Sequence, residues 1–513
     1  MTNGGVGSAA PRPCRRRDAQ RGFHTVDRRT FLIGSGALGG LALTGGLTAC
    51  RPPADSILNL PATSSPIDNV VIVMMENRSF DHWLGWLGTD DAWHDNAVSR
   101  YGPDATVNGS QTQTYLDPSG NPVPTAHLLD YLASGNPWRG CDHPDPGHGW
   151  NHGRIQRDLG FLASGSGNDP FATGYYLADD VPFSSRLARR FTVCDQWFAA
   201  LLGPTYPNRL YLHSAQSGGQ KTNYLPINEG GYGWPTIWER LSGAGVTAEY
   251  YYVDLPVTAL FGQRLNPFNH PIDDYFTRCG EGTLPQVTFV DPGFLNGSRT
   301  DNHPHADIRA GEAFLRDVFA AFANSPQWSN GLFILTYDEW GGFFDHVAPT
   351  MAMDDRGSYS DADNFAQRGF RVPAVIASPY SQVGAVDHTV YDHTSILRFL
   401  EWRFLGAPAL GVGADGDNWW LTSRDRWANN LGAALVQTPT VDIGMDLGVA
   451  IDPPSVECAT DPGADLDPGA PPVPASAPVG YQKHAFEQAL DEGYFERVGS
   501  TPVTTTMAAD WVH

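Results

Sequence analysis

The sequence predicts an α/β fold, a sandwich of helices on both faces of a mostly parallel central sheet. Continuous apolar, β-branched runs such as NVVIVMM at residues 69–75 are typical of strands buried on both faces. Segments with helical spacing separate these runs along the chain, which is the alternation that builds parallel sheets. Polar residues directly follow several runs, and ligands of open α/β sheets lie outside the carboxyl ends of the strands.

The elements follow this alternation in order. Further strands are expected within residues 191–198 (FTVCDQWF), 249–254 (EYYYVD), 286–292 (QVTFVDP), 332–339 (LFILTYDE) and 371–380 (RVPAVIASPY). Helices are expected within residues 306–324 and 394–405. Residues 89–180, rich in Gly, Pro, Asn and Asp, are expected to form long loops over the edge where the strands end. The main domain is therefore expected at 69–449, followed by a Pro/Ala-rich linker and tail at 450–513.

The first 49 residues have the pattern of an export signal. Arginines precede a Gly-rich apolar stretch, and DRRTFL at 27–32 resembles a twin-arginine signal. LTAC at 47–50 resembles a lipobox, so Cys50 is the expected lipidation site, with residues 50–68 as a flexible tether. We expect an exported protein that uses the twin-arginine machinery, anchored by lipid to the outer face of the bacterial cytoplasmic membrane or secreted. The alternative interpretation of this stretch is a transmembrane anchor, which its many glycines disfavour.

Composition excludes some functions. The 513 residues carry a formal net charge of -23, which argues against nucleic acid as a partner. Four of the six cysteines lie beyond the signal and lipobox, at 141, 194, 279 and 458, and allow up to two disulfides in three possible pairings. Their spacing does not match a structural zinc site.

Oxygen ligands gather at two strand ends. Glu76 and Asn77 follow the run at 69–75, and Asp338 and Glu339 follow the run that begins at Leu332. Both pairs would reach the same edge of the sheet. Carboxylate and amide oxygens suit a hard cation, so we expect one divalent metal ion, Ca²⁺, Mg²⁺ or Mn²⁺ rather than Zn²⁺. Taken singly, each pair is also compatible with a capping Asn and solvated acids.

A candidate nucleophile is Thr205, in GPTYPNRLYLH at residues 203–213. Gly203 and Pro204 make a turn, and Pro207 suits the first turn of a helix that begins near Tyr206. Exposed amides at a helix start favour a phosphate group, and an adjoining cation would lower the pKa of the hydroxyl. The alternative is an ordinary threonine N-cap.

Four histidines are candidates for acid or charge-stabilising roles: His148, His303, His346 and His393. Histidine titrates in the neutral range and suits protonation of a leaving alkoxide. A serine hydrolase is disfavoured, because Ser79 lies in ENRSFDH and not in a GxSxG turn.

Five ordered motifs between residues 69 and 405 resemble the phosphoesterase family of bacterial phospholipases C and acid phosphatases, which includes plant non-specific phospholipases C. They are ENRSFDH at 76–82, FTVCDQWFAALLGPTYPNRLYLHSA at 191–215, YDEWGGFFDHV at 337–347, GFRVPAVIASPYS at 369–381 and YDHTSILRFLE at 391–401.

The resemblance implies an alkaline-phosphatase-like α/β/α sandwich and a covalent phospho-enzyme. Glu76, Asn77, Asp338 and Glu339 would bind the metal, and Thr205 would be both ligand and nucleophile. His303 and His148 are similar to the transition-state and leaving-group histidines of the family. A last group would support the site or bind substrate: His346, His393, Asn208 and Arg209.

Substrate class stays open at this point. Two segments depart from the pattern of the family. The segment at 152–175 lacks the Trp-Asn-Gly-Gly pattern of the lipase members, and the segment at 249–299 is short for the family. The first hypothesis is a phospholipase C that acts on phospholipid. An acid phosphatase on soluble monoesters and a lipoprotein that binds a ligand without turnover are the alternatives.

Overall fold

The computed structural model describes residues 52–132, 136–226, 229–295, 299–358, 360–413, 418–441, 447–452, 454 and 458. Within this part of the chain an eight-stranded sheet runs in the order β12-β6-β11-β10-β1-β9-β7-β8. Its strands are β1 (Asn69–Met75), β6 (Thr192–Cys194), β7 (Ala248–Tyr252), β8 (Asn269–Pro271), β9 (Val287–Asp291), β10 (Gly331–Tyr337), β11 (Ala374–Ala377) and β12 (Ala385–Asp387).

The centre of the sheet consists of the strands with the most apolar sequences. Every residue of β1 and of β10 is buried, as expected for strands covered on both faces. β1 pairs in parallel with β10 and β9, so that Met75 lies opposite Tyr337. Of the described strands of this sheet, β11 runs antiparallel to its two neighbours, β10 and β6. The predicted mostly parallel sheet is confirmed.

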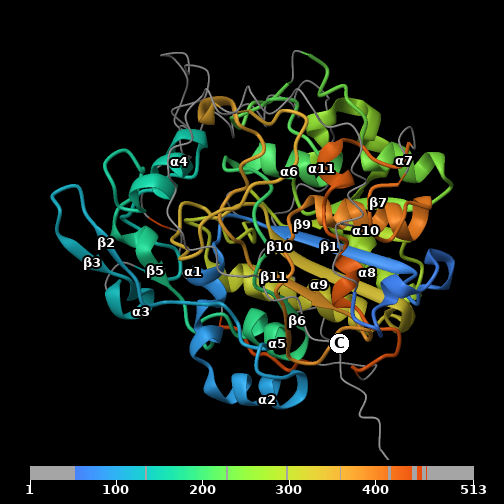
Figure 1. Cartoon of the computed structure of the whole chain (residues 1–513), viewed down its shortest axis with the longest axis horizontal. Helices are drawn as coiled ribbons and strands as arrows, with labels where there is room; N and C mark the ends of the chain where they lie inside the picture. Colours follow the sequence, from blue (N-terminus) through green and yellow to red (C-terminus); the bar gives the residue numbers. More distant parts are fainter. Residues whose placement is uncertain are drawn as a thin grey trace, which may run out of the picture. The chain divides into compact units, whose positions relative to one another are not determined.

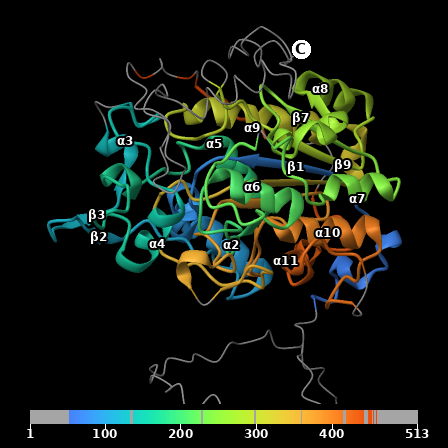
Figure 2. The same ribbon diagram turned by 90° about the horizontal axis from the view of Figure 1, so that it is seen from above.

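Helices cover both faces of this sheet, as Figure 1 and Figure 2 show. One layer holds α5 (Pro182–Arg190), α8 (Ile272–Glu281) and α9 (Ile308–Ala323), and α9 contacts both of the others. The other layer holds α6 (Thr205–Ser214), α7 (Ile237–Gly243), α10 (Thr394–Leu405) and α11 (Ser423–Arg426), where α10 contacts the other three. The predicted α/β/α sandwich is therefore present.

Shorter elements lie around the sandwich. The helices are α1 (Phe80–Leu84), α2 (Asp91–Tyr101), α3 (Leu128–Tyr131) and α4 (Trp150–Leu159), and the short strands are β2 (Thr114–Leu116), β3 (Pro122–Pro124), β4 (Ala126–His127) and β5 (Gly174–Tyr175). Short 3-10 helices occur at Ile57–Asn59, Ala62–Ser64, Gly85–Thr89, Pro170–Thr173, Pro326–Asn330, Asp361–Asp363 and Leu431–Ala434. A longer 3-10 segment, Val257–Phe268, is kinked at Gly262.

The expectation of long loops at 89–180 is only partly correct. Residues in this stretch form α2 and α4. The apolar periodicity of α2 is weak, but its start is stabilised by an N-cap, where the Asp90 carboxylate accepts a hydrogen bond from the Trp93 amide. α4 begins at Trp150, and its buried face carries the polar residues Arg154 and Gln156. The apolar spacing that predicts a helix is therefore weak in this segment.

The tether is shorter than the predicted 50–68. Ile57 and Ile67 are fully buried, and the Ile57 amide donates to the Leu435 carbonyl at 3.0 Å. Apolar residues in a short Pro-rich stretch thus pack against the domain. The proposed signal at 1–49, Cys50 and nearly all of the tail lie outside the described residues. Within the described part, no helix combines the length and apolar character needed to cross a membrane.

One of the possible disulfides is formed. Cys141 and Cys458 are bonded across 317 residues of sequence, while Cys194 and Cys279 are buried and reduced. Burial raises the pKa of both free thiols, which keeps them unreactive at neutral pH. The bridge fastens Cys458 to the loop between α3 and α4.

Candidate active site

Three parallel strands deliver acidic side chains to one edge of the sheet. Glu76 follows β1, Asp338 follows β10 and Asp291 ends β9. The amide of Asn77 donates to Asp338 Oδ1 at 3.0 Å, and the amide of Asp338 donates to the Met75 carbonyl at 3.0 Å. The predicted meeting of the two ligand pairs at one edge is confirmed.

Backbone geometry brings the two loops into contact. Asn77 adopts a left-handed conformation with φ of 58°, which Asn tolerates better than most residues. Gly341 has φ of 61°, and a Cβ there would lie 2.2 Å from the Asn77 carbonyl oxygen. Only glycine allows this close approach, which explains the WGG segment after Glu339. The amide of Gly341 in turn donates to Glu339 Oε2 at 2.7 Å.

Arg209 forms ion pairs with three of the buried acids. Its guanidinium lies 3.3 Å from Glu76, 3.1 Å from Asp291 and 3.3 Å from Asp338, with a side chain only 2% exposed. Burial alone would lower the pKa of this arginine, but the three carboxylates raise it instead. Arg209 is therefore a fixed positive charge that balances part of the acidic cluster.

The carboxylates outnumber this charge. Burial raises the pKa of Glu76, Asp338 and Glu339, and it raises that of Asp291 to about 7. Arg209 opposes the shift at Glu76, Asp291 and Asp338. Buried acids that are under-neutralised favour a bound cation over their free charged state.

Two oxygen atoms identify where a cation fits. Asn77 Oδ1 and Glu339 Oε1 are buried and accept no hydrogen bond from the part of the chain that the structure describes. Such atoms are costly unless something binds them. With the Glu76 and Asp338 carboxylates they form an all-oxygen donor set, which suits a hard divalent ion. The residues present fit a metal of this class.

Thr205 is the first residue of α6 rather than its N-cap, a position that Pro204 takes. Asn208 builds the turn before it: Oδ1 accepts from the Leu201 amide at 2.8 Å and Nδ2 donates to the Gly203 carbonyl at 2.8 Å. Arg209 lies one turn further along the same helix, about 6 Å along the axis. Since Arg209 contacts three of the acids, α6 presents Thr205 toward the same edge.

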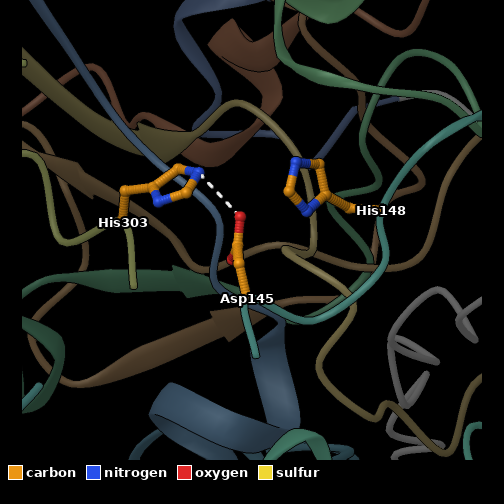
Figure 3. Close-up of side chains that lie close together, drawn as sticks. All are labelled: Asp145, His148 and His303. Carbon is orange, nitrogen blue, oxygen red and sulfur yellow. Dashed lines mark ion pairs between the residues drawn. The ribbon is translucent and has the colours of Figure 1, made fainter. Parts of the chain in front are cut away.

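His148, His303 and Asp145 lie close together, as Figure 3 shows. His303 Nε2 is 3.6 Å from Asp145 Oδ2, and the two imidazole rings are 5.8 Å apart. His148 Nε2 lies 3.4 Å from Asn77 Nδ2 and 4.0 Å from Glu339 Oε1. The structure thus places His148 against two predicted ligand residues, and His303 beside His148.

The other two predicted histidines occupy supporting positions. His393 Nε2 donates to the Asp338 carbonyl at 2.6 Å, which holds the residue after β10 in place. His346 belongs to a second buried cluster, where its Nδ1 lies 2.5 Å from Asp81 Oδ2. His346 follows Asp338 and Glu339 in the same loop, and Asp81 follows Glu76 and Asn77 in theirs, so this cluster joins the two loops away from the predicted ligands.

Sequence reasoning missed three acids: Asp145, Asp291 and Asp301. Asp291 ends an apolar run just as Glu76 follows one, so its signal was available. Asp301 accepts the His303 amide at 3.0 Å, and burial raises its pKa to about 6. Asp145 lies in a Gly/Pro-rich loop without periodicity, and only the fold places it beside His303.

Acids at the carboxyl ends of parallel strands, a hydroxyl at a helix start and two imidazoles are groups that suit the cleavage of a phosphoester. The Phosphoesterase family model matches residues 67–405, and the chain belongs to this family. It is accordingly a hydrolase.

Two relatives of known name, one from a plant and one from a bacterium, have phospholipase C in their names. "Non-specific phospholipase C4" of Arabidopsis thaliana is 32% identical over 420 residues, covering 76% of this chain and 75% of the relative. "Phospholipase C B" of Mycobacterium tuberculosis is 31% identical over 414 residues, covering 69% and 76%.

Among solved structures, a protein in the alkaline phosphatase superfamily from Vibrio parahaemolyticus matches with 10% identity and a TM-score of 0.29. The match covers 52% of this chain and 70% of that chain.

Proposed function

We propose that this protein is an exported phosphodiesterase of the phospholipase C type, which cleaves phospholipid through a phosphothreonine intermediate on Thr205. The observation that carries the proposal is the excess of buried carboxylates over Arg209, gathered at the sheet edge that α6 also reaches. Plant and bacterial relatives with phospholipase C in their names support the substrate class.

One divalent cation would be held by Glu76, Asn77, Thr205, Asp338 and Glu339. When bound, it supplies neutralisation of the substrate phosphate and lowers the pKa of the threonine hydroxyl. Ca²⁺, Mg²⁺ and Mn²⁺ match the oxygen donors better than Zn²⁺ does.

The residues of the chain divide the remaining chemistry. Thr205 Oγ1 attacks phosphorus while the bond to the alcohol oxygen breaks. His303 gives its proton to the departing alcohol and regains one from the water that later hydrolyses the phosphothreonine. His148 lies between this position and the ligand residues, where it stabilises charge on the phosphoryl oxygens.

The location is proposed from the sequence. A twin-arginine signal at 1–49 and lipidation at Cys50 would place the domain at the outer face of the membrane, where phospholipid is available. The disulfide between Cys141 and Cys458 supports an oxidising compartment.

The test is Thr205→Ala, with Thr205→Ser as the matched control that keeps a hydroxyl. We expect hydrolysis of p-nitrophenylphosphorylcholine to fall by roughly four orders of magnitude in the alanine variant, as for loss of other nucleophiles. The serine variant should retain measurable turnover and trap phosphate on its side chain. If the alanine variant works as fast as the wild type, the nucleophile is elsewhere.

Substrate class is tested separately with the wild-type enzyme. Phosphatidylcholine and p-nitrophenyl phosphate should be compared by kcat/KM under the same conditions. Faster cleavage of the diester is expected, and a preference for the monoester would assign the protein as a phosphatase instead.

A further inference from the structure

Asp145 has no role in the chemistry described so far, yet its carboxylate forms an ion pair with the imidazole ring of His303. Its Oδ2 lies 3.6 Å from His303 Nε2, and its side chain is only 4% exposed. Figure 3 shows the carboxylate directed toward the imidazole of His303, with His148 on its other side. A buried carboxylate at this distance acts on the charge of the ring.

The orientation of the His303 ring is fixed from the opposite side. Its Nδ1 hydrogen-bonds the Pro304 carbonyl, which can only accept, so Nδ1 carries a proton. Nε2 is therefore the nitrogen that faces Asp145 and that can exchange a proton with the substrate. Since both Nε2 and the carboxylate are acceptors when unprotonated, their approach favours a proton between them.

His148 is directed elsewhere. Its Nδ1 donates to the Pro146 carbonyl at 2.8 Å, and its Nε2 lies against Asn77 and Glu339. Asp145 and His303 therefore form an ion pair, while the Nε2 of His148 lies against the predicted oxygen ligands.

Other groups around His303 oppose its protonation. Burial, and then the positive charges of Arg299, His148 and His305, lower the pKa of His303. Arg299 donates to the His303 carbonyl at 3.4 Å, and Asp301 is bound to the His303 amide rather than to its ring. A negative charge next to Nε2 is what a proton there requires.

We propose that Asp145 is a positioning residue that keeps His303 oriented and charged for proton donation to the leaving oxygen. This inference rests on the proposed function. In the first step the Thr205 oxygen forms its bond to phosphorus and the bond to the alcohol oxygen breaks. The electron pair stays on that oxygen, and the proton on His303 Nε2 moves to it, so that the neutral imidazole remains beside the Asp145 carboxylate.

The experiment compares two substrates that share a head group but differ in leaving group. p-Nitrophenylphosphorylcholine releases a stable phenolate that needs little help from an acid, whereas short-chain, monomeric phosphatidylcholine releases an alkoxide that needs a proton. We expect Asp145→Asn to lower kcat/KM for phosphatidylcholine by about 100-fold, within the range for loss of general acid catalysis. For the nitrophenyl substrate we expect a loss of less than about fivefold.

Two variants provide the controls. Asp169→Asn removes an acid that pairs with His143 at 2.6 Å in the same region, and it should reduce neither rate by more than about twofold. His303→Gln should show the same leaving-group dependence as Asp145→Asn. Adding Asp145→Asn to His303→Gln should cost nothing further, because the two residues act as one unit.

Other outcomes overturn the inference. An equal loss on both substrates would indicate a merely structural role, and unchanged cleavage of phosphatidylcholine would indicate no role. If Asp145→Asn lowers the bound metal by one equivalent, a cation rather than a proton lies between Asp145 and His303. Retained activity of Thr205→Ala, in contrast, would contradict the proposed function itself, whatever the Asp145 variant does.

Discussion

Two buried clusters in this molecule are made of the same residue types but differ in charge balance. At the sheet edge, Glu76, Asp291 and Asp338 share the single guanidinium of Arg209. In the second cluster, Arg371 contacts Asp81 at 3.1 Å and Asp345 at 2.9 Å.

His346 adds a further donor to the second cluster. Its amide and its Nδ1 both bond Asp81 Oδ2, at 2.7 Å and 2.5 Å. The Asp81, Asp345 and His346 ligand atoms lie within 4.8 Å of one another, as those of Asp145, His148 and His303 do. Proximity alone therefore does not distinguish an ion site from an ion-pair network.

The difference lies in what is left unsatisfied. Arg371 is fully buried, and donates to both oxygens of Asp345 and to the Asp195 and Asn108 carbonyls. At the sheet edge, Asn77 Oδ1 and Glu339 Oε1 accept no hydrogen bond from described residues. The satisfied cluster therefore holds two loops together, whereas the cluster at the sheet edge leaves two oxygen atoms available to a cation.

The largest effect is expected for Arg371→Met, which would leave Asp81 and Asp345 buried without their main countercharge. Removing one partner from a buried pair typically costs about 3–5 kcal/mol of unfolding free energy. Urea unfolding of the variant and the wild type, both in chelator, measures it. A loss below about 1 kcal/mol would mean that this cluster is not a neutralised network.

A smaller effect is expected for Gly341→Ala, which tests the contact between the loops that carry Asn77 and Glu339. The added Cβ would meet the Asn77 carbonyl, and φ of 61° is unfavourable for alanine, so we expect a loss of about 1–3 kcal/mol. Metal affinity should fall as well, because Glu339 moves. Gly233→Ala is the matched control, since a Cβ there meets nothing within 4 Å.

The smallest effect is expected at the rim of the Arg371 network. His388 Nδ1 lies 2.9 Å from Asp195 Oδ1, and this hydrogen bond raises the pKa of His388 from 6.5 to about 9. Because the folded pKa is the higher one, the stabilisation is full below pH 6.5 and is lost as pH rises through about 9. The side chain is 44% exposed, so screening limits the effect to at most about 1 kcal/mol.

Unfolding of His388→Gln and wild type at three pH values checks this. The two proteins should differ at pH 6 and converge by pH 10. A difference that grows with pH would contradict the assignment of the pair.

The parallel strands that carry Glu76 and Asp338 were predictable from particular residues. The apolar runs before Glu76 and Asp338 are uninterrupted, and burial of both strand faces allows little other than a parallel sheet there. Thr205 was indicated by the turn and proline of GPTYP. The helix at 91–101 was not predictable, because most of its residues are polar and the apolar spacing typical of a helix is weak.

Long-range pairing could not be predicted in the same way. Four cysteines allowed three pairings, and only the fold shows that Cys141 meets Cys458. Arg209 and Arg371 have the same signature in sequence, a single arginine in an apolar context, yet they neutralise different numbers of acids. Asp145 meets His303 across more than 150 residues of loop and core, and such contacts are set by tertiary packing.

The central claim is that the under-neutralised acids at the sheet edge hold the cation. Metal content after dialysis should be measured for wild type, Asp338→Asn and the matched variant Asp345→Asn. We predict about one equivalent in the wild type and in Asp345→Asn, and almost none in Asp338→Asn. A full equivalent in Asp338→Asn, or its loss in a folded Asp345→Asn protein, would contradict the account.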